Sequence, residues 1–110
     1  MIAKTLLDYL DANLDVPVVM EAPEQLTDYV LIDQTGSSRT NHIITTTFAI
    51  QSYGDTLYDA MLLNDEVKDA MVGFAELDEI TRVELETDYN FTNTATKQYR
   101  WQAVYQITHY

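Results

Sequence analysis

The chain has 110 residues, of which 46% are hydrophobic and only five are glycine or proline, so one folded domain over 1–110 is expected rather than disorder. It has no cysteine, which excludes disulfides, thiolate metal sites and thiol nucleophiles. Eighteen acidic residues against six basic ones give a net charge of −12, which excludes a surface that attracts nucleic acid through its phosphates. No apolar run approaches the ~20 residues of a membrane span, so no membrane partner is expected.

The acidic charge leaves three interpretations open. The surface can meet a basic partner, or it can line a passage through which DNA slides without sticking. It can also serve only to keep the protein dispersed, because a net charge far from zero opposes association. Composition alone does not decide among them.

The first part of the chain predicts one helix and two short strands. Apolar residues recur at four-residue steps over 2–14, the pattern of an amphipathic helix, and Pro17 ends it. A brief strand at 18–20 and a second strand at 29–32 follow. The polar segment 35–42 contains turn-forming residues and no apolar side chain, so it predicts a loop at the tip of an extended hairpin.

The rest of the chain predicts a third strand, a second helix and two further strands. β-Branched and aromatic residues alternate over 43–53, and apolar residues return at three- and four-residue steps over 55–74. Alternation resumes over 80–89, and 90–96 is polar turn sequence. The last strand covers 97–110.

One face of this last strand is apolar and aromatic, and the other is mostly polar. At ~3.3 Å per residue the segment would run roughly 40 Å, longer than a small domain needs. Such a strand either spans a whole sheet or projects beyond it to meet another chain. It contains no group typical of catalysis, which favours a role in assembly. The apolar face consists of Tyr99, Trp101, Ala103, Tyr105 and Ile107.

These elements predict an α+β fold, with a mainly antiparallel four- to five-stranded sheet and two helices packed on one face. The sheet is expected to supply one side of the core and the helices the other. The expected core residues of the sheet are Val30, Ile32, Phe48, Ile50, Val83, Leu85, Trp101, Ala103, Tyr105 and Ile107. Those of the helices are Leu6, Leu10, Leu57, Met61, Val67 and Met71.

The sequence offers little that could carry chemistry. His42 and His109 lie in a predicted loop and at the end of the last strand, so a catalytic or metal-binding pair would need the fold to bring them together. The glycine-containing loop at 35–38 lacks the lysine and the second glycine of a phosphate-binding loop.

Three carboxylates, Glu84, Glu86 and Asp88, are expected on the outer face of the strand at 80–89. Carboxylates side by side can hold Mg²⁺ or Ca²⁺, or share a proton. Alternation alone also predicts a solvated strand face, and this interpretation is favoured. No catalytic residue, cofactor or metal site is therefore predicted in the chain.

Three groups of local sequence carry a family resemblance. The first is 17–23 (PVVMEAP) with 28–36 (DYVLIDQTG), and the second is 47–54 (TFAIQSYG), which leads into the second helix. The third is 89–92 (YNFT) with 99–108 (YRWQAVYQIT). Together with the order of elements, they resemble the tail terminator proteins of long-tailed bacteriophages, also called tail completion or head-to-tail joining proteins. The likeness covers nearly the whole chain.

The resemblance implies a structural protein rather than an enzyme. It implies a homohexameric ring at the head-proximal end of a tail tube, where the ring stops tube growth and docks to the head. The implied partners are other copies of the chain, the tail tube protein, the head connector protein and genomic DNA that passes without specific binding. The implied location is the virion tail, after assembly in the host cytoplasm of a phage or prophage.

Contacts with subunits or partners are expected in the two polar loops, because these loops have few groups to anchor them locally. They are also expected on the outer face of the fourth strand, if this face lines the channel or a subunit boundary. The residues concerned are Ser37, Ser38, Arg39, Thr40, Asn41, Glu84, Glu86 and Asn93. Two alternatives stay open. One is a neck or connector protein on the head side, and the other is a soluble acidic module that masks a basic partner.

Overall fold

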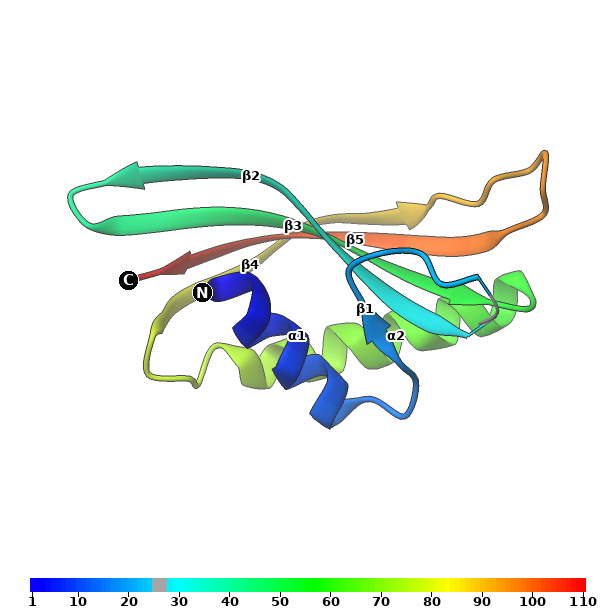
Figure 1. The fold of residues 1–110 in the computed structure, drawn as a ribbon, viewed down its shortest axis with the longest axis horizontal. Helices are drawn as coiled ribbons and strands as arrows, with labels where there is room; N and C mark the ends of the chain where they lie inside the picture. Colours follow the sequence, from blue (N-terminus) through cyan, green and yellow to red (C-terminus); the bar gives the residue numbers. More distant parts are fainter. Residues whose placement is uncertain (25–27) are drawn as a thin grey trace.

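The computed structural model describes residues 1–24 and 28–110 and extends over 44 × 25 × 22 Å. Figure 1 shows a layer of sheet lying over two helices, which is the predicted α+β architecture. In chain order the elements are α1 (Ile2–Asn13), β1 (Val18–Val19), β2 (Tyr29–Thr40), β3 (Ile43–Gly54), α2 (Leu57–Phe74), β4 (Ile80–Asn90) and β5 (Tyr99–His109).

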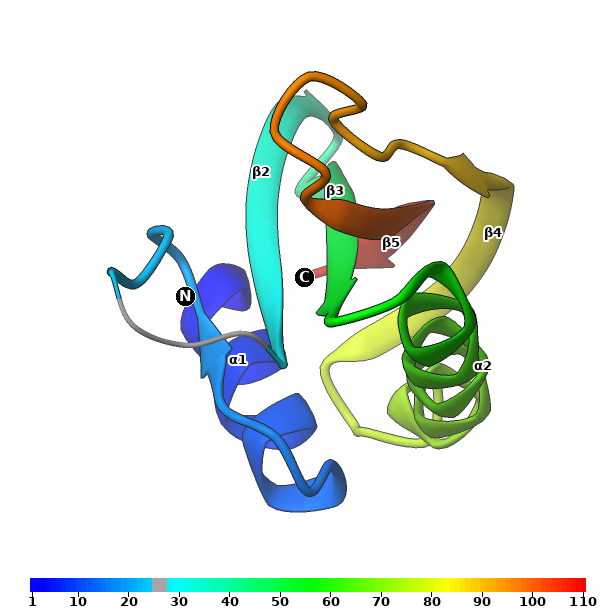
Figure 2. The ribbon, with the colours of Figure 1, turned by 90° about the vertical axis from the view of Figure 1, so that its right-hand side faces the viewer.

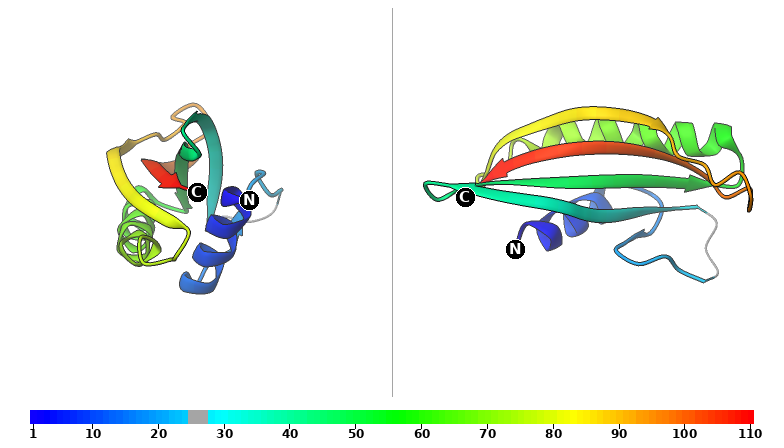
Figure 3. Two further views of the ribbon diagram at one scale, coloured as in Figure 1. Left: turned by 90° about the vertical axis from the view of Figure 1, so that its left-hand side faces the viewer. Right: turned by 90° about the horizontal axis from the view of Figure 1, so that it is seen from above.

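The five strands form one sheet in the order β1-β2-β3-β5-β4. All neighbours are antiparallel except β1, which pairs parallel with β2, so the mainly antiparallel sheet is mixed. Its strands twist strongly, as the end view and the top view of Figure 3 show. β5 pairs with β3 along its whole length and with β4 on the other side. The last strand therefore spans the sheet and does not project from it.

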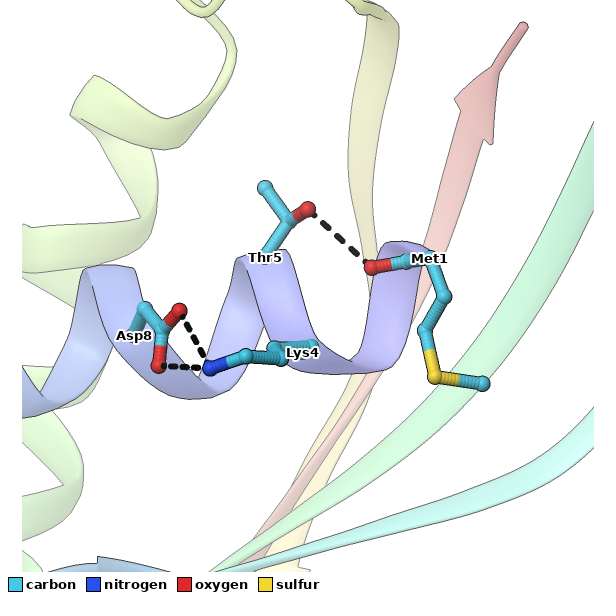
Figure 4. Close-up of polar contacts among 4 residues, drawn as sticks. All are labelled: Met1, Lys4, Thr5 and Asp8. Atoms are coloured by element: carbon cyan, nitrogen blue, oxygen red, sulfur yellow. Dashed lines mark hydrogen bonds and ion pairs between the residues drawn. The ribbon is translucent and has the colours of Figure 1, made fainter.

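Helix α1 is held mainly by burial. Its first turn has no side-chain cap. Two side-chain contacts occur there: the Thr5 hydroxyl donates to the Met1 carbonyl at 3.1 Å, and Lys4 Nζ pairs with Asp8 Oδ2 at 2.9 Å (Figure 4). Both charged side chains are exposed, and exposed pairs add little to stability. Leu6 and Leu10, in contrast, are fully buried under the sheet.

Helix α2 begins at a tight connection from β3. The Thr56 hydroxyl accepts a hydrogen bond from the Asp59 N–H at 3.1 Å and caps the helix. A Cβ at Gly54 would lie 2.7 Å from the Ala60 nitrogen, so the strand and the helix can approach this closely only at a glycine. The two helices contact each other through the Tyr9 hydroxyl, which donates to the Ala70 carbonyl at 2.7 Å.

The core lies between the sheet and the helices, as predicted. The expected core residues that are buried are Val30, Ile32, Phe48, Ile50, Ala103, Tyr105, Ile107, Leu6, Leu10, Val67 and Met71. Three are only half-buried, namely Leu57, Val83 and Trp101. The predictions for Leu85 and Met61 are wrong, because their side chains are 40% and 43% exposed. Leu85 lies on the edge strand, and Met61 lies on the solvent side of α2.

The predicted loop at 35–42 is also wrong. β2 continues to Thr40 and pairs with β3 up to Ile43, so the turn contains only Asn41 and His42. Both turn residues have positive φ, at 50° and 71°, as a two-residue hairpin of this type requires. The Ser- and Thr-rich composition indicated a loop because the strand there covers no core, so no apolar alternation marked it.

The predicted acidic face of β4 is interrupted by a β-bulge. The register shifts between Leu85 and Thr87, so the residues after the bulge exchange faces. Asp88 therefore points to the helix side, where its carboxylate accepts from the Trp101 indole N–H at 2.9 Å and lies 3.5 Å from Lys68 Nζ. Only Glu84 and Glu86 stay on the outer face.

Tyr105 should make the fold sensitive to alkaline pH. Burial, and secondarily the Asp88 carboxylate, raises the pKa of Tyr105 from 10.0 to about 12. Its contribution to stability is therefore complete below pH 10 and is lost as the pH rises towards 12. The difference corresponds to about 3 kcal/mol. We expect the free energy of unfolding to fall over this range, and to fall less in Tyr105→Phe. Equal falls in urea denaturation series of both proteins would contradict this.

Candidate functional site

The predicted contact residues do not form one site. Residues 33–43, here called the projecting hairpin, extend from one end of the molecule (Figure 1) and include positions 37–41. Glu84 and Glu86 lie on the outer face of the edge strand β4, the face away from the helices. Asn93 lies in the loop 91–98 at the opposite end (Figure 1).

The strands of the projecting hairpin are paired, with one β-bulge between Gln34 and Gly36, but the hairpin buries nothing. All eleven residues from Asp33 to Ile43 are exposed. Beyond Leu31, β2 has no second strand neighbour in the described residues, so its outer backbone edge is open. Ordering these residues costs conformational entropy that no core contact offsets. An exposed strand edge of this kind is also a template for pairing with another chain.

Glu84 and Glu86 are each held by a neighbour on the outer face. Arg82 Nη2 lies 2.6 Å from a Glu84 oxygen, and the Gln106 amide donates to Glu86 at 2.6 Å. Register places Glu84 opposite Gln106, and Gln106 opposite Thr47 on β3. Thr47 in turn pairs with Gly36, so the row of cross-strand partners that begins at Glu84 ends in the projecting hairpin.

The outer face contains a polar network that sequence analysis did not predict. The Tyr53 hydroxyl donates to the Gln51 amide oxygen at 2.7 Å, and the Gln51 amide nitrogen donates to the Gln102 amide oxygen at 2.8 Å. Gln102 in turn donates to the Tyr89 hydroxyl. Three of these side chains are buried although no helix covers this face, with Tyr53 only 4% exposed.

The amide pair at the centre of the network should be strongly coupled. Replacing Gln102 with Leu leaves the Gln51 amide without its partner, which should cost about 1–3 kcal/mol. The double variant Gln51→Leu/Gln102→Leu should cost less than the sum of the two single changes, because no buried amide is then left unpaired. Urea denaturation of the four proteins measures this coupling. Additive costs would show that the amides act independently.

Arg100 attaches the loop 91–98 to this network. Its Nε donates to the Phe91 carbonyl at 2.6 Å, and its Nη1 donates to the Tyr53 hydroxyl at 3.0 Å. The guanidinium also lies 4.4 Å from the centre of the Phe91 ring. Tyr53 stacks on Tyr29, with the ring centres 4.3 Å apart. Burial at this place raises the pKa of the Tyr29 hydroxyl. The loop itself is closed by reciprocal backbone hydrogen bonds between Asn93 and Gln98.

A groove of about 500 Å³ runs between this loop and the strand ends. Figure 2 views the molecule from that end. Polar and aromatic side chains line the groove, and Lys97 contributes the one cation among them, while Asp55 contributes the one carboxylate. The lining residues are Tyr29, Tyr53, Gly54, Asp55, Asn93, Thr96, Lys97 and Gln98.

Charge is unevenly distributed along the chain. No acidic residue occurs in 34–54 or in 89–110, which include all of the projecting hairpin except Asp33, as well as β3, β5 and the loop 91–98. All 18 acids therefore lie in 1–33 and 55–88, which include both helices and β4. The three bases in those acidic segments, Lys4, Lys68 and Arg82, all form ion pairs. In the described part of the chain, no ion pair includes the three bases of the acid-free segments, which are Arg39, Lys97 and Arg100.

Two sequence signals could have located this surface. The outward positions of the last strand include Gln102 and Gln106, and an amide-rich strand face is unusual for simple solvation. The long acid-free segments were also visible in a chain with this many acids. The contacts between these side chains depend on the register in which β3 pairs with β5. The sequence pattern does not determine this register.

Within residues 1–24 and 28–110, no group of three or more His, Cys, Asp or Glu side chains is placed to hold a metal ion. In the same residues, no helix is long and apolar enough to cross a membrane. His42 and His109 are not brought together; the buried His109 instead contacts the Thr46 hydroxyl at 2.9 Å. No protein-family model matches the chain, and no curated protein matches it.

Proposed function

We propose that this chain is a structural subunit of a bacteriophage or prophage tail. In this proposal it forms a homohexameric ring at the head-proximal end of the tail tube, ends tube growth and joins the tail to the head. It acts by assembly and not as an enzyme. It works in the virion tail after assembly in the host cytoplasm, with the tail tube protein and the head connector protein as partners.

The projecting hairpin is the observation that carries this proposal. Nine of its eleven consecutive exposed residues lie in strands and the other two form the turn, although none of them adds to the core. A segment of this kind is stabilised when a second protein covers it. The five predicted contact residues at 37–41 all lie in it. The sequence resemblance supports the more specific role, because the matching strings include parts of β2 and β3 and nearly all of β5.

The charge distribution supports the same role. The acid-rich helices and the acid-free strands β3 and β5 give each copy two unlike surfaces, which favours contact between different patches of neighbouring copies. Contacts of this head-to-tail kind generate rings when the rotation between copies closes. A net charge of −12 per subunit also suits a ring through which DNA passes without binding.

Self-association should respond to charge on the outer face. Six copies bring many carboxylates together, and salt shortens the range of their repulsion to ~8 Å at physiological ionic strength. We therefore expect a monomer at micromolar concentration in low salt and a hexamer as concentration, salt or Mg²⁺ rises. Glu84→Gln/Glu86→Gln should favour the ring if this face lines the channel or a subunit boundary. Sedimentation equilibrium measures each effect.

A matched control separates the effect of where the carboxylates lie from the effect of the total net charge. Asp11→Asn/Asp15→Asn removes one carboxylate from α1 and one from the segment that follows it, and should shift the equilibrium less than the β4 variant does. Equal shifts would show that only the total charge matters, and so would remove β4 from the boundary. A monomer that binds a basic protein under every condition would favour the acidic binding module. A ring that binds connectors but not tubes would favour the head-side neck protein.

A further inference from the structure

We propose that the groove beside the loop 91–98 binds carboxylates from the α2–β4 loop of a second copy of this chain, in a head-to-tail contact. The acceptor groups are Lys97 and Arg100, and the donated carboxylates are those of Glu76, Asp78 and Glu79. This inference rests on the proposed function, because it concerns how the subunits of the ring recognise each other.

The groove offers cationic and polar groups, and Asp55 is the one carboxylate in its lining. Lys97 lines it, and Arg100 lies beside it, bonded to the hydroxyl of Tyr53 in the groove wall. Neither cation is ion-paired within the described residues, although the chain has 18 acids. The amides of Asn93 and Gln98 line the same wall and add hydrogen-bonding groups.

Arg100 is held in place before any partner arrives. Arg100 is half-buried and fixed by the Phe91 carbonyl, the Tyr53 hydroxyl and the Phe91 ring. Lys97 has a φ of 54°, a conformation that glycine or asparagine adopts more readily than lysine does. A charged hydrogen bond to a positioned guanidinium is stronger and more directional than one to a mobile side chain.

The α2–β4 loop is the matching surface. Glu76, Asp78 and Glu79 are exposed and form no ion pair among the described residues. They follow directly after the C-terminal end of α2, whose last turn contains no basic residue. The helix dipole disfavours negative charge at this end, so cations from a neighbouring copy would relieve an unfavourable arrangement.

The two surfaces lie at opposite ends of the molecule. Figure 1 shows the loop 91–98 at one end of the long axis and the α2–β4 loop at the other, and the top view in Figure 3 agrees. Within one copy, these carboxylates therefore cannot form ion pairs with Lys97 or Arg100. A contact between unlike ends leaves both surfaces of the next copy available, so it can repeat from copy to copy until a ring closes.

Charge reversal tests this contact. Lys97→Glu should weaken self-association by about tenfold or more, because it replaces attraction by repulsion. Lys4→Glu changes the net charge equally at an exposed site on α1 and should weaken it much less. Adding Asp78→Lys to Lys97→Glu should restore association, whereas adding Asp65→Lys, at an exposed site along α2, should not. Sedimentation equilibrium gives the constants, and thermal melting confirms that each monomer is folded.

The outcomes separate this inference from the proposed function. If the wild-type chain assembles and Lys97→Glu assembles as well as Lys4→Glu does, the contact is wrong and the ring stands. Restoration by Asp65→Lys as well as by Asp78→Lys would also overturn the contact, because net charge would then explain both results. A wild-type chain that stays monomeric under all conditions overturns the ring and the contact together.

Discussion

Shortening the projecting hairpin should abolish ring formation and leave the monomer folded. Ser38 and Thr45 are direct cross-strand partners, so residues 39–44 can be replaced by Asn-Gly, which forms a two-residue hairpin turn. All the residues removed by this deletion are exposed except Ile44, which is half-buried. The deletion also removes the pairing of Ile44 with His109 between β3 and β5. The melting temperature should therefore change little. Sedimentation and circular dichroism measure the two properties on the same samples.

A variant that changes only the charge of the hairpin is the control for the shortened protein. Arg39→Gln in the full-length hairpin removes its one cation but keeps its shape and backbone edge. We expect this variant to assemble more weakly than the wild type and clearly better than the shortened protein. A shortened protein that forms rings as well as the wild type would show that the hairpin makes no essential contact.

Replacing Phe48 with Ala should produce the largest loss of stability. Phe48 lies at the centre of the sheet, is fully buried and faces the helices. Truncating a buried phenylalanine removes its burial and leaves a cavity, which together cost about 3–5 kcal/mol. That is a large part of the free energy of unfolding of a typical small domain, roughly 5–15 kcal/mol. Urea or thermal denaturation of the purified variant measures the loss.

Phe91→Ala is the matched comparison, because it makes the same chemical change at a ring that is 39% exposed. The Phe91 ring contacts Arg100 and stands edge-on to Tyr89. A cation–π contact at such a site contributes about 0.5–1 kcal/mol, so the loss should be several times smaller than for Phe48. Equal losses at the two positions would mean that the core is not centred under β3.

The sequence predicted the number, order and type of the main elements, and most of the core. Helix and strand periodicity is strong wherever one face of an element covers the core, as it does at Leu6, Phe48 and Ile107. The prediction of secondary structure was wrong where neither face of an element covers the core. The projecting hairpin has no buried face, so its strands have no apolar alternation, and its turn uses Asn41-His42 in place of the more familiar Asn-Gly.

The candidate surfaces were less predictable than the fold, because they depend on register. A bulge after Leu85 moved Asp88 to the helix side, and nothing in the local sequence marks such a shift. The Gln51–Gln102 bond joins residues 51 positions apart and exists only because β3 and β5 pair in one particular register. Arg100 was visible as an outward residue, but its position beside Tyr53 followed from the same register.

Electron microscopy of the purified chain at high concentration and ionic strength, alone and mixed with tail tubes, tests the central claim most directly. We expect closed rings with six-fold symmetry and a single ring at one end of each tube. The shortened-hairpin variant should give neither. Monomeric particles in every condition, together with tubes that carry no added ring at either end, would contradict the proposed role in the tail.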